Sequence, residues 1–262
     1  MDVSVWLGTV AALLAATWRT STPLIYAGLG ETFTERAGVL NIGLEGIMLF
    51  GALAAYLTAL DTGNLVAALL VSLLVGAAAG LAFAVFTVSI KANQIIVGTA
   101  LNLIGLGVTG FVFRSLFSQT VPSLATVFGP VDVPLLSQLP YLGEVLFRQS
   151  LLVYATALLV PLASLLLYRT AFGLSLRAVG DHPRAADTVG IDVDRQRYAA
   201  TVLGAMLAAL GGAYLSIAQT NVFVENMTAG RGFIALAAVV FGRWRPVGVL
   251  GASLLFGASY AL

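Results

Sequence analysis

Residues 41–46, which read NIGLEG, place an amide and a carboxylate at the start of an otherwise apolar segment. Ionisable groups inside a membrane are costly, so they usually face the interior of a helix bundle and take part in function. The two glycines around Asn and Glu predict a locally unwound backbone, which membrane depth tolerates only where it is buried in protein or lines a cavity. Asn41 and Glu45 are therefore candidates for contact with a solute that crosses the membrane. The alternative is a simple helix start, with Asn41 as its cap and Glu45 at the membrane interface.

Residues 224–233, VENMTAGRGF, form a second polar interruption, from which we take Gly230 and Phe233 as candidates. The apolar run that follows is about ten residues long, which at about 1.5 Å per residue crosses only half of a membrane. It therefore predicts a half helix. Aligning Gly43 with Gly232 reveals a weak internal similarity. Broken helices that enter from opposite sides in an inverted repeat are typical of transporters.

Between these two interruptions, the amides Asn93 and Gln94 begin an apolar run, and the amide Asn102 lies in its middle. An unpaired amide at that depth is costly. Asn102 therefore either contacts the cargo or forms a hydrogen bond between helices. The complete set of candidate translocation residues is Asn41, Glu45, Asn93, Gln94, Asn102, Gly230 and Phe233.

The composition is that of a membrane protein. Hydrophobic residues make up 59% of the 262 residues, only 10% are charged, and the mean hydropathy is +0.98. Soluble domains contain about 25% charged residues, so most of this surface must face lipid. Cysteine is absent, which excludes disulfide and thiolate chemistry, and the net charge of +1 implies no nucleic acid partner. We expect an all-α, polytopic membrane protein.

A helix needs about 20 apolar residues to cross the hydrocarbon, and five runs meet this requirement. They are 39–60, 65–90, 95–117, 151–168 and 199–217. Three more apolar runs, which are shorter or interrupted, are 3–17, 23–30 and 232–262. They are complete spans, broken helices or re-entrant segments, so about seven to nine membrane segments form one permease domain over residues 1–262. The sequence stops inside an apolar run, so we expect the natural protein to continue.

Charge orients the chain. Residues 169–198 contain Arg169, Arg177, Arg184, Arg195 and Arg197 between two spans. Short basic loops stay on the cytoplasmic side, which places this loop and Lys91 inside and residues 61–64 and 118–150 outside. Within the loop, Asp181 and Pro183 predict a helix start, Gly190 predicts its end, and Asp192 or Asp194 caps the next helix.

A helix of two turns is marginal by itself in water. It is either a helical turn that rests on its own protein or a docking element for a soluble partner.

Three blocks resemble the permease subunits of bacterial ABC importers in the branched-chain amino acid and simple-sugar permease superfamily. They read TERAGVLNIGLEGIMLFGA, GLSLRAVGDHPRAADTVGIDVDRQRYAATVLGAMLAALGGAYLSI and NMTAGRGFIALAAVVFG, in the first and last thirds of the chain. The form ERAGVLNIGLEGIM is most similar to the nucleoside or simple-sugar branch. The resemblance implies that the loop carries a coupling helix, which sits in a cleft of the ATPase subunit. The residues implied are Arg177, Asp181, Arg184, Ala185, Ala186, Asp187, Gly190 and Ile191.

The sequence lacks the means to hydrolyse ATP. A phosphate-binding loop needs a glycine-rich turn ending in Gly-Lys, and the only lysine is Lys91, between Ile90 and Ala92. The single histidine, His182, has no partner for a metal or nucleophile site. We therefore expect no catalytic residue, no metal and no cofactor in this chain, with ATP bound by a partner subunit.

The leading interpretation is a multi-pass permease subunit in the cytoplasmic (inner) membrane of a bacterium, which imports nucleosides by alternating access. The implied partners are membrane lipid, a second permease subunit that is homologous or identical, two ATPase subunits and an extracytoplasmic substrate-binding protein. Three alternatives stay open: a simple-sugar ABC permease, a stand-alone secondary transporter or channel, and a membrane enzyme. The small-molecule cargo itself follows from the resemblance alone.

Overall fold

The structure, a computed structural model, describes residues 3–117, 120–132, 134, 137 and 142–262. The long helices are α1 (Val3–Arg36), α2 (Leu44–Thr62), α3 (Leu65–Ala84), α4 (Gln94–Leu116), α6 (Leu151–Arg169) and α9 (Val193–Tyr214). The shorter helices are α5 (Leu142–Leu146), α7 (Ala171–Asp181), α8 (Pro183–Thr188), α10 (Arg231–Phe241) and α11 (Pro246–Ala261). Two π-helical turns, η1 (Val85–Ser89) and η2 (Leu215–Gln219), extend α3 and α9. Two short strands, β1 (Pro130–Asp132) and β2 (Arg148–Ser150), pair antiparallel with Pro130 opposite Ser150.

The five predicted spans are confirmed. Helices long and apolar enough to cross a membrane run over Leu44–Thr62, Leu65–Ser89, Gln94–Leu116, Leu151–Arg169 and Val193–Gln219. The first begins five residues later than predicted, because residues 37–43 are not helical. Together with α1, α10 and α11, they make the all-α, polytopic bundle that the composition indicates.

The first two short apolar runs are joined in a single helix. The structure contains α1, 34 residues long, which continues through Pro23. Proline removes one backbone donor from a helix, and in membranes nearby hydroxyl groups help to accommodate such an interruption. Here the hydroxyls of Thr20, Ser21 and Thr22 all donate to carbonyls of the preceding turn.

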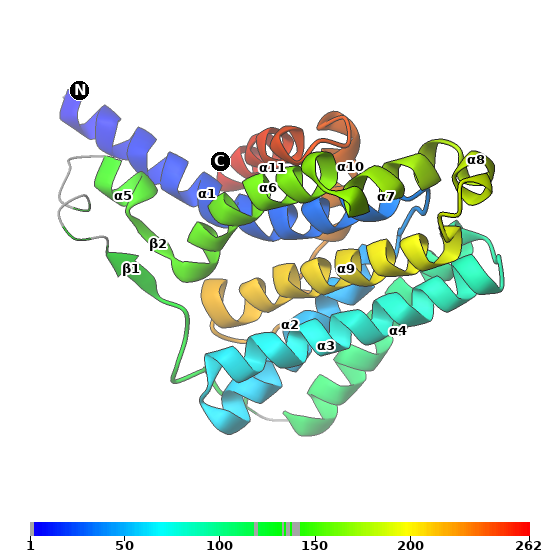
Figure 1. Ribbon diagram of the computed structural model, residues 1–262. Helices are drawn as coiled ribbons and strands as arrows, with labels where there is room; N and C mark the ends of the chain where they lie inside the picture. Colours follow the sequence, from blue (N-terminus) through cyan, green and yellow to red (C-terminus); the bar gives the residue numbers. More distant parts are fainter. Residues whose placement is uncertain (1–2, 118–119, 133, 135–136, 138–141) are drawn as a thin grey trace.

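Helices α1 and α9 lie side by side at the centre of the bundle (Figure 1). Helices α2 and α3 also pack on α9, while α10 and α11 pack against α1. Small residues allow the close approach: a Cβ atom on Gly30 of α1 would collide with the backbone of Gly204 of α9. Such contacts between glycines are typical of membrane helices, whose association depends on close packing.

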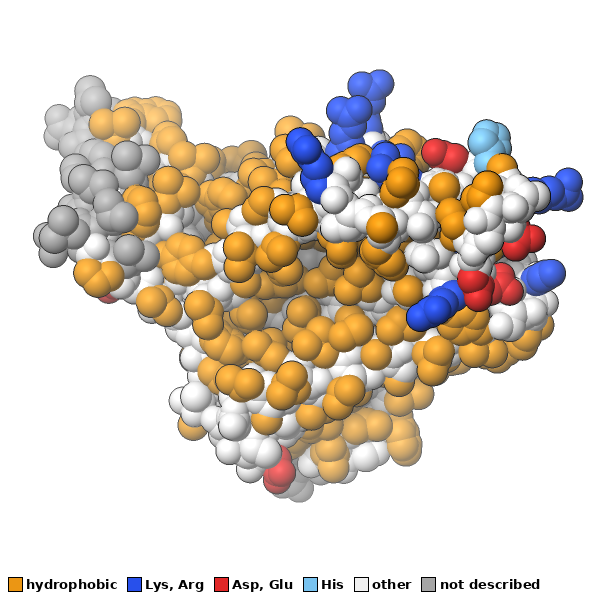
Figure 2. Space-filling model, in the orientation of Figure 1, with side chains coloured by type: hydrophobic (Ala, Val, Ile, Leu, Met, Phe, Trp, Pro, Cys, Tyr) orange, Lys and Arg blue, Asp and Glu red, His pale blue; other side chains and the backbone are white. Residues whose placement is uncertain are grey.

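Figure 2 shows an apolar surface with charged side chains gathered at the end formed by α7 and α8. The exposed apolar side chains include Leu74 of α3 and Phe111 of α4, each 68% exposed. Exposed apolar side chains of this kind are suited to contact with lipid. The basic end is the cytoplasmic end by the charge rule, and β1 and β2 lie at the opposite end of the molecule in Figure 1.

One detail of the basic loop was predicted wrongly. Asp181 does not cap α8, because α7 extends through it and the His182 N–H still bonds to a carbonyl of α7, that of Ala178. The N-cap of α8 is His182, without a side-chain bond, and Pro183 is the first helical residue. The cap of α9 is Asp192, whose carboxylate accepts from the Arg195 N–H at 2.9 Å.

Candidate functional site

Glu45 links the two polar interruptions. It lies in the first turn of α2 and is 7% exposed. Its carboxylate accepts the backbone N–H of Gly230 at 2.7 Å and that of Gly232 at 2.6 Å. These N–H groups belong to the N-terminus of α10, where helix donors have no partner within the helix and where the helix dipole favours a negative charge. Glu45 therefore caps α10 from another helix, 185 residues away in sequence from Gly230.

The two glycines are required by this contact. Gly230 has a φ of +85°, in the left-handed region that side chains disfavour. A Cβ atom on Gly232 would lie 2.7 Å from the Cα of Glu45 and 2.8 Å from its carboxylate. A larger residue at position 232 would therefore move α10 away from α2, whereas one at position 230 would strain the backbone that presents the N–H to Glu45.

The break before α2 is held by buried polar groups. Glu31 of α1, 0% exposed, accepts the Asn41 N–H at 2.8 Å. The side-chain oxygen of Asn41 accepts the Gly43 N–H at 2.9 Å. Asn41 is thus part of the turn that precedes α2, while its side-chain nitrogen has no hydrogen-bond partner in the described part of the chain.

Two amide side chains of α4 form hydrogen bonds to the backbone at the same break. Gln94 accepts the Leu40 N–H at 2.8 Å. Asn102 donates to the Ile42 carbonyl at 2.9 Å and accepts the Gly46 N–H at 2.8 Å. Of the two interpretations of Asn102, the structure places it in a hydrogen bond between helices.

The structure therefore brings together five of the seven candidate translocation residues: Asn41, Glu45, Gln94, Asn102 and Gly230. The other two lie elsewhere. Asn93 is exposed and caps α4 by accepting the Ile95 N–H at 2.9 Å, and Phe233 is 49% exposed on α10. The role of all seven in transport stays a prediction.

Two residues near the break were missing from the predicted set. Glu31 has one carboxylate oxygen, and Thr228 a hydroxyl, that are buried and without a hydrogen-bond partner among the described residues. Both side chains are 0% exposed. An acid inside the apolar stretch of α1 is a visible sequence signal for Glu31, whereas Thr228 is one polar residue of several in its loop.

A second cluster lies where α10 turns into α11, at the basic end. The Trp244 indole N–H donates to Glu35, and the Trp244 carbonyl accepts from the Arg36 side chain at 3.1 Å. The Tyr168 hydroxyl also reaches this carbonyl, at 3.5 Å. The guanidinium of Arg177 in α7 lies 5.1 Å from the centre of the Tyr168 ring, a cation–π distance. The basic loop is thus linked through Tyr168 of α6 to the turn that follows α10.

The backbone of this turn is unusual. Arg243 and Trp244 have φ values of +55° and +54°, although non-glycine residues rarely enter the left-handed region. Such a conformation persists only where the surroundings enforce it, and the bonds from α1 and α6 to Trp244 do so here.

Comparison with known proteins decides the family. The sequence model of a family described as branched-chain amino acid transport system, permease component, matches residues 13–262. The chain belongs to this permease family. No solved structure matches it.

Individual relatives are similar over most of the chain. TsgC13 of Haloferax volcanii, whose name assigns it provisionally to glucose ABC transport, is 41% identical over 96% of this chain and 77% of its own length. NupC of Lactococcus lactis, a nucleoside ABC transporter permease, is 41% identical over 90% of this chain and 77% of its own. NupQ of Bacillus subtilis, a guanosine ABC transporter permease, is 37% identical over 97% and 82%. Each of these organisms also has a second, more distantly similar permease for the same named cargo.

The family and the helices together define the class of protein. The chain is the permease component of an ABC transporter and a multi-pass protein of the cytoplasmic membrane. Such a permease is a transport component, which acts with an ATPase and a substrate-binding component. This finding favours the ABC interpretation over the stand-alone transporter and the membrane enzyme.

Proposed function

We propose that this chain is a permease subunit of an ABC importer for nucleosides. The observation that carries the proposal is the contact at Glu45. Two interrupted segments, one entering from each side of the membrane, meet there end to end among buried polar groups of an otherwise apolar bundle. In transporters, broken helices that meet near the midplane form the place where a solute passes. Glu31, Asn41 and Thr228 each have a buried polar side-chain atom without a hydrogen-bond partner among the described residues. These atoms could form hydrogen bonds to a solute.

The nucleoside assignment is supported by the relatives. NupC and NupQ are named for nucleosides and guanosine, respectively. TsgC13, which is equally similar to the chain as NupC, is named for glucose, so a simple sugar is the second candidate.

Uptake by cells separates the two cargos. The test is radiolabelled guanosine uptake by a strain that expresses the whole importer, with unlabelled nucleosides or glucose as competitors. We expect competition by adenosine and cytidine and none by glucose. No uptake of guanosine, with uptake of radiolabelled glucose by the same strain, would assign the importer to sugars.

The proposed mechanism couples the basic loop to the half helix α10. The ATPase would dock on the residues Arg177, Asp181, Arg184, Ala185, Ala186, Asp187, Gly190 and Ile191. Arg184, Ala185 and Asp187 are exposed on α8, whereas Ala186 is buried. Next to them Val189 is 75% exposed, as expected for an apolar side chain that a partner covers. ATP-driven closure would then move α7, and the cluster at Tyr168 and Trp244 would pass the displacement to α10.

Docking is tested by co-purification. Arg184→Glu reverses a charge at the exposed tip and should release the ATPase while the permease remains in the membrane. Arg148→Glu, at the opposite end of the molecule, is the matched control and should retain the ATPase. Retention of the ATPase by both variants would refute the assignment of the docking surface.

The proposed assembly contains two permeases, two ATPases that hold the ATP, and an extracytoplasmic substrate-binding protein, with no cofactor in this chain. A heteromeric permease pair is favoured, because the organism of each of the three relatives also has a second, more distantly similar permease named for the same cargo. Mass spectrometry of the purified complex would identify the partner, and a complex with two copies of this chain alone would contradict the heteromeric pair.

A further inference from the structure

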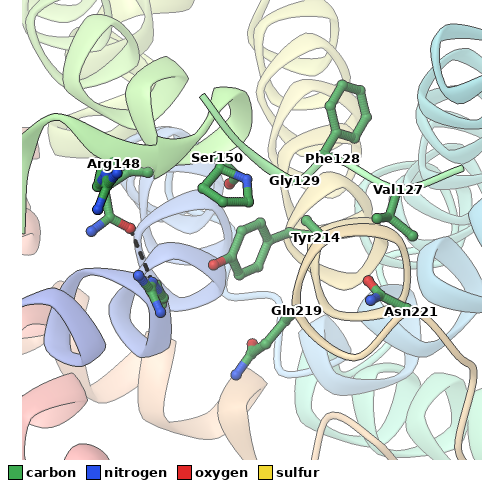
Figure 3. Close-up of a pocket in the computed structure, with 12 residues that line it drawn as sticks. Val127, Phe128, Gly129, Arg148, Ser150, Tyr214, Gln219 and Asn221 are labelled. Atoms are coloured by element: carbon green, nitrogen blue, oxygen red, sulfur yellow. Dashed lines mark hydrogen bonds between the residues drawn. The ribbon is translucent and has the colours of Figure 1, made fainter. Parts of the chain in front are cut away.

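A second polar site lies at the end of the molecule opposite the basic loop. A cavity of about 290 Å³ opens between α1, the strands β1 and β2, and the end of α9 with η2. Arg19, Phe128, Ser150, Tyr214, Gln219 and Asn221 are among its lining residues. In Figure 3 the ring of Tyr214 lies between Ser150 above it and Gln219 below it, and Phe128 and Asn221 lie to its right. The charge rule places this end outside the cytoplasm.

Two polar atoms of the lining lack partners. The hydroxyl oxygen of Ser150 and the side-chain oxygen of Gln219 are both buried, and neither has a hydrogen bond within the described part of the chain. Buried polar atoms are nearly always paired, so each exception needs an explanation. Because both atoms line the same cavity, a ligand with hydroxyl or amine donors would satisfy them together.

Charge in the cavity is supplied mainly by Arg19. Arg148 forms an ion pair with Asp132 at 2.9 Å. Arg19 donates through its Nε to the side-chain oxygen of Gln149 at 3.2 Å, and no carboxylate of the described residues forms an ion pair with it. A guanidinium has five N–H donors in a planar fork, so Arg19 can still bind the acceptor edge of a flat ligand.

We propose that this cavity is an outer binding site for one nucleoside within a single permease chain. The inference rests on the proposed function. The ring of Phe128, which is only partly buried, offers a face on which a base can stack, and the ring of Tyr214, 2% exposed, forms the floor beneath it. Arg19 can pair with the oxygen and ring nitrogen of a purine, as arginine does with guanine. The unpaired side-chain oxygens of Ser150 and Gln219 can accept hydrogen bonds from the hydroxyls of the sugar.

The size and charge of the cavity restrict the class of ligand further. Ligand pockets in proteins measure about 300–1,000 Å³, so this cavity is at the lower limit and holds a single small molecule. One arginine without a carboxylate partner suits a neutral ligand with acceptor atoms. A phosphate group favours clusters of cations, which excludes a nucleotide as the preferred ligand. Tyr214, which forms the floor of the cavity, also packs in the core cluster that contains Leu44 and Ile47 of α2.

The test is equilibrium binding to the assembled importer in lipid nanodiscs. The substrate-binding protein is omitted, because it would bind the nucleoside itself. The probes are radiolabelled guanosine, glucose and guanosine monophosphate. We expect saturable binding of guanosine that is about tenfold weaker in both Arg19→Gln and Gln219→Leu, which corresponds to the loss of one good polar contact.

Two matched controls lie outside the cavity. Gln196→Leu changes an amide near the start of α9, the helix that η2 extends, and its side-chain oxygen is also buried and without a hydrogen bond among the described residues. Arg114→Gln removes an arginine that pairs with Glu225 at 3.2 Å. Both should bind guanosine within about twofold of the unchanged protein. Ser150→Ala is a small change inside the cavity that leaves packing intact, and it should also weaken guanosine binding. Weaker binding by this variant could not be attributed to misfolding.

The outcomes separate this inference from the proposed function. Absence of guanosine binding, or equal binding by the cavity variants, would overturn the inference, and normal guanosine uptake by the whole importer would then leave the proposed function standing. Tighter binding of guanosine monophosphate than of guanosine would overturn the inference that the preferred ligand is neutral. Binding of glucose in place of guanosine, weakened by the same substitutions, would overturn both.

Discussion

Replacing Glu45 by alanine is the sharpest test of how the two interrupted segments are held together. The substitution removes both acceptors of α10, the bonds of 2.7 Å to Gly230 and 2.6 Å to Gly232. Their N–H groups would be left without acceptors, in a site where Glu45 itself is 7% exposed. The start of α10 should then separate from α2.

The magnitude follows from the number and type of bonds. A hydrogen bond to a charged group contributes about 1.5–3 kcal/mol to stability, and hydrogen bonds between membrane helices tend toward lower values. Two bonds at the lower end give a loss of about 3 kcal/mol in the free energy of unfolding. For a chain of this size, about 2–4 °C of melting temperature corresponds to each kcal/mol. We therefore expect Glu45→Ala to lower the melting temperature by roughly 6–12 °C.

The assay combines thermal unfolding of the purified protein in detergent with guanosine uptake by cells. Glu45→Gln keeps one acceptor oxygen and should lose roughly half as much stability. Glu225→Ala removes an exposed carboxylate, whose side chain is 40% exposed in its pair with Arg114, and should change the melting temperature by about 4 °C or less. If Glu45→Ala unfolds at the same temperature as Glu225→Ala and transports normally, the capping interpretation is wrong.

Three further substitutions probe other contacts. Gly232→Ala should abolish uptake, because its Cβ atom would meet the backbone of Glu45, whereas Gly251→Ala in α11, with no atom within 4 Å, should transport normally. Asn102→Leu should lower the melting temperature by several degrees and leave the affinity for guanosine unchanged, since its amide bonds to backbone; a changed affinity with unchanged stability would assign it to the cargo instead. Trp244→Phe removes the donor to Glu35 and should lower the uptake achieved per ATP hydrolysed; an unchanged ratio would exclude this contact from coupling.

Local patterns were sufficient to predict much of the fold. Each of the five spans is a long apolar run with polar residues at its ends, which length and composition reveal. The break before α2 and the short helix α10 follow from glycines and polar residues in otherwise apolar sequence. The single helix α1 was not evident, because the effect of Pro23 depends on hydroxyl groups whose bonding the sequence does not specify.

Contacts between distant segments were beyond prediction. Glu45 was a candidate as a polar residue in an apolar run, but its partners Gly230 and Gly232 lie more than 180 residues further along the chain. The same holds for Trp244 and Glu35, which are 209 residues apart. Asp181 was expected to cap α8, but it lies in α7. The sequence did not reveal this, because the extent of α7 depends on its packing and not on its last residue alone.

The central claim is that this chain carries nucleosides inward under the control of an ATPase. Its most direct test is guanosine uptake into proteoliposomes that contain the complete purified importer, with ATP supplied on the side of the ATPase. The account predicts accumulation against a gradient that requires ATP and ceases when the ATPase is omitted. Accumulation without the ATPase, or accumulation of glucose but not guanosine, would contradict it.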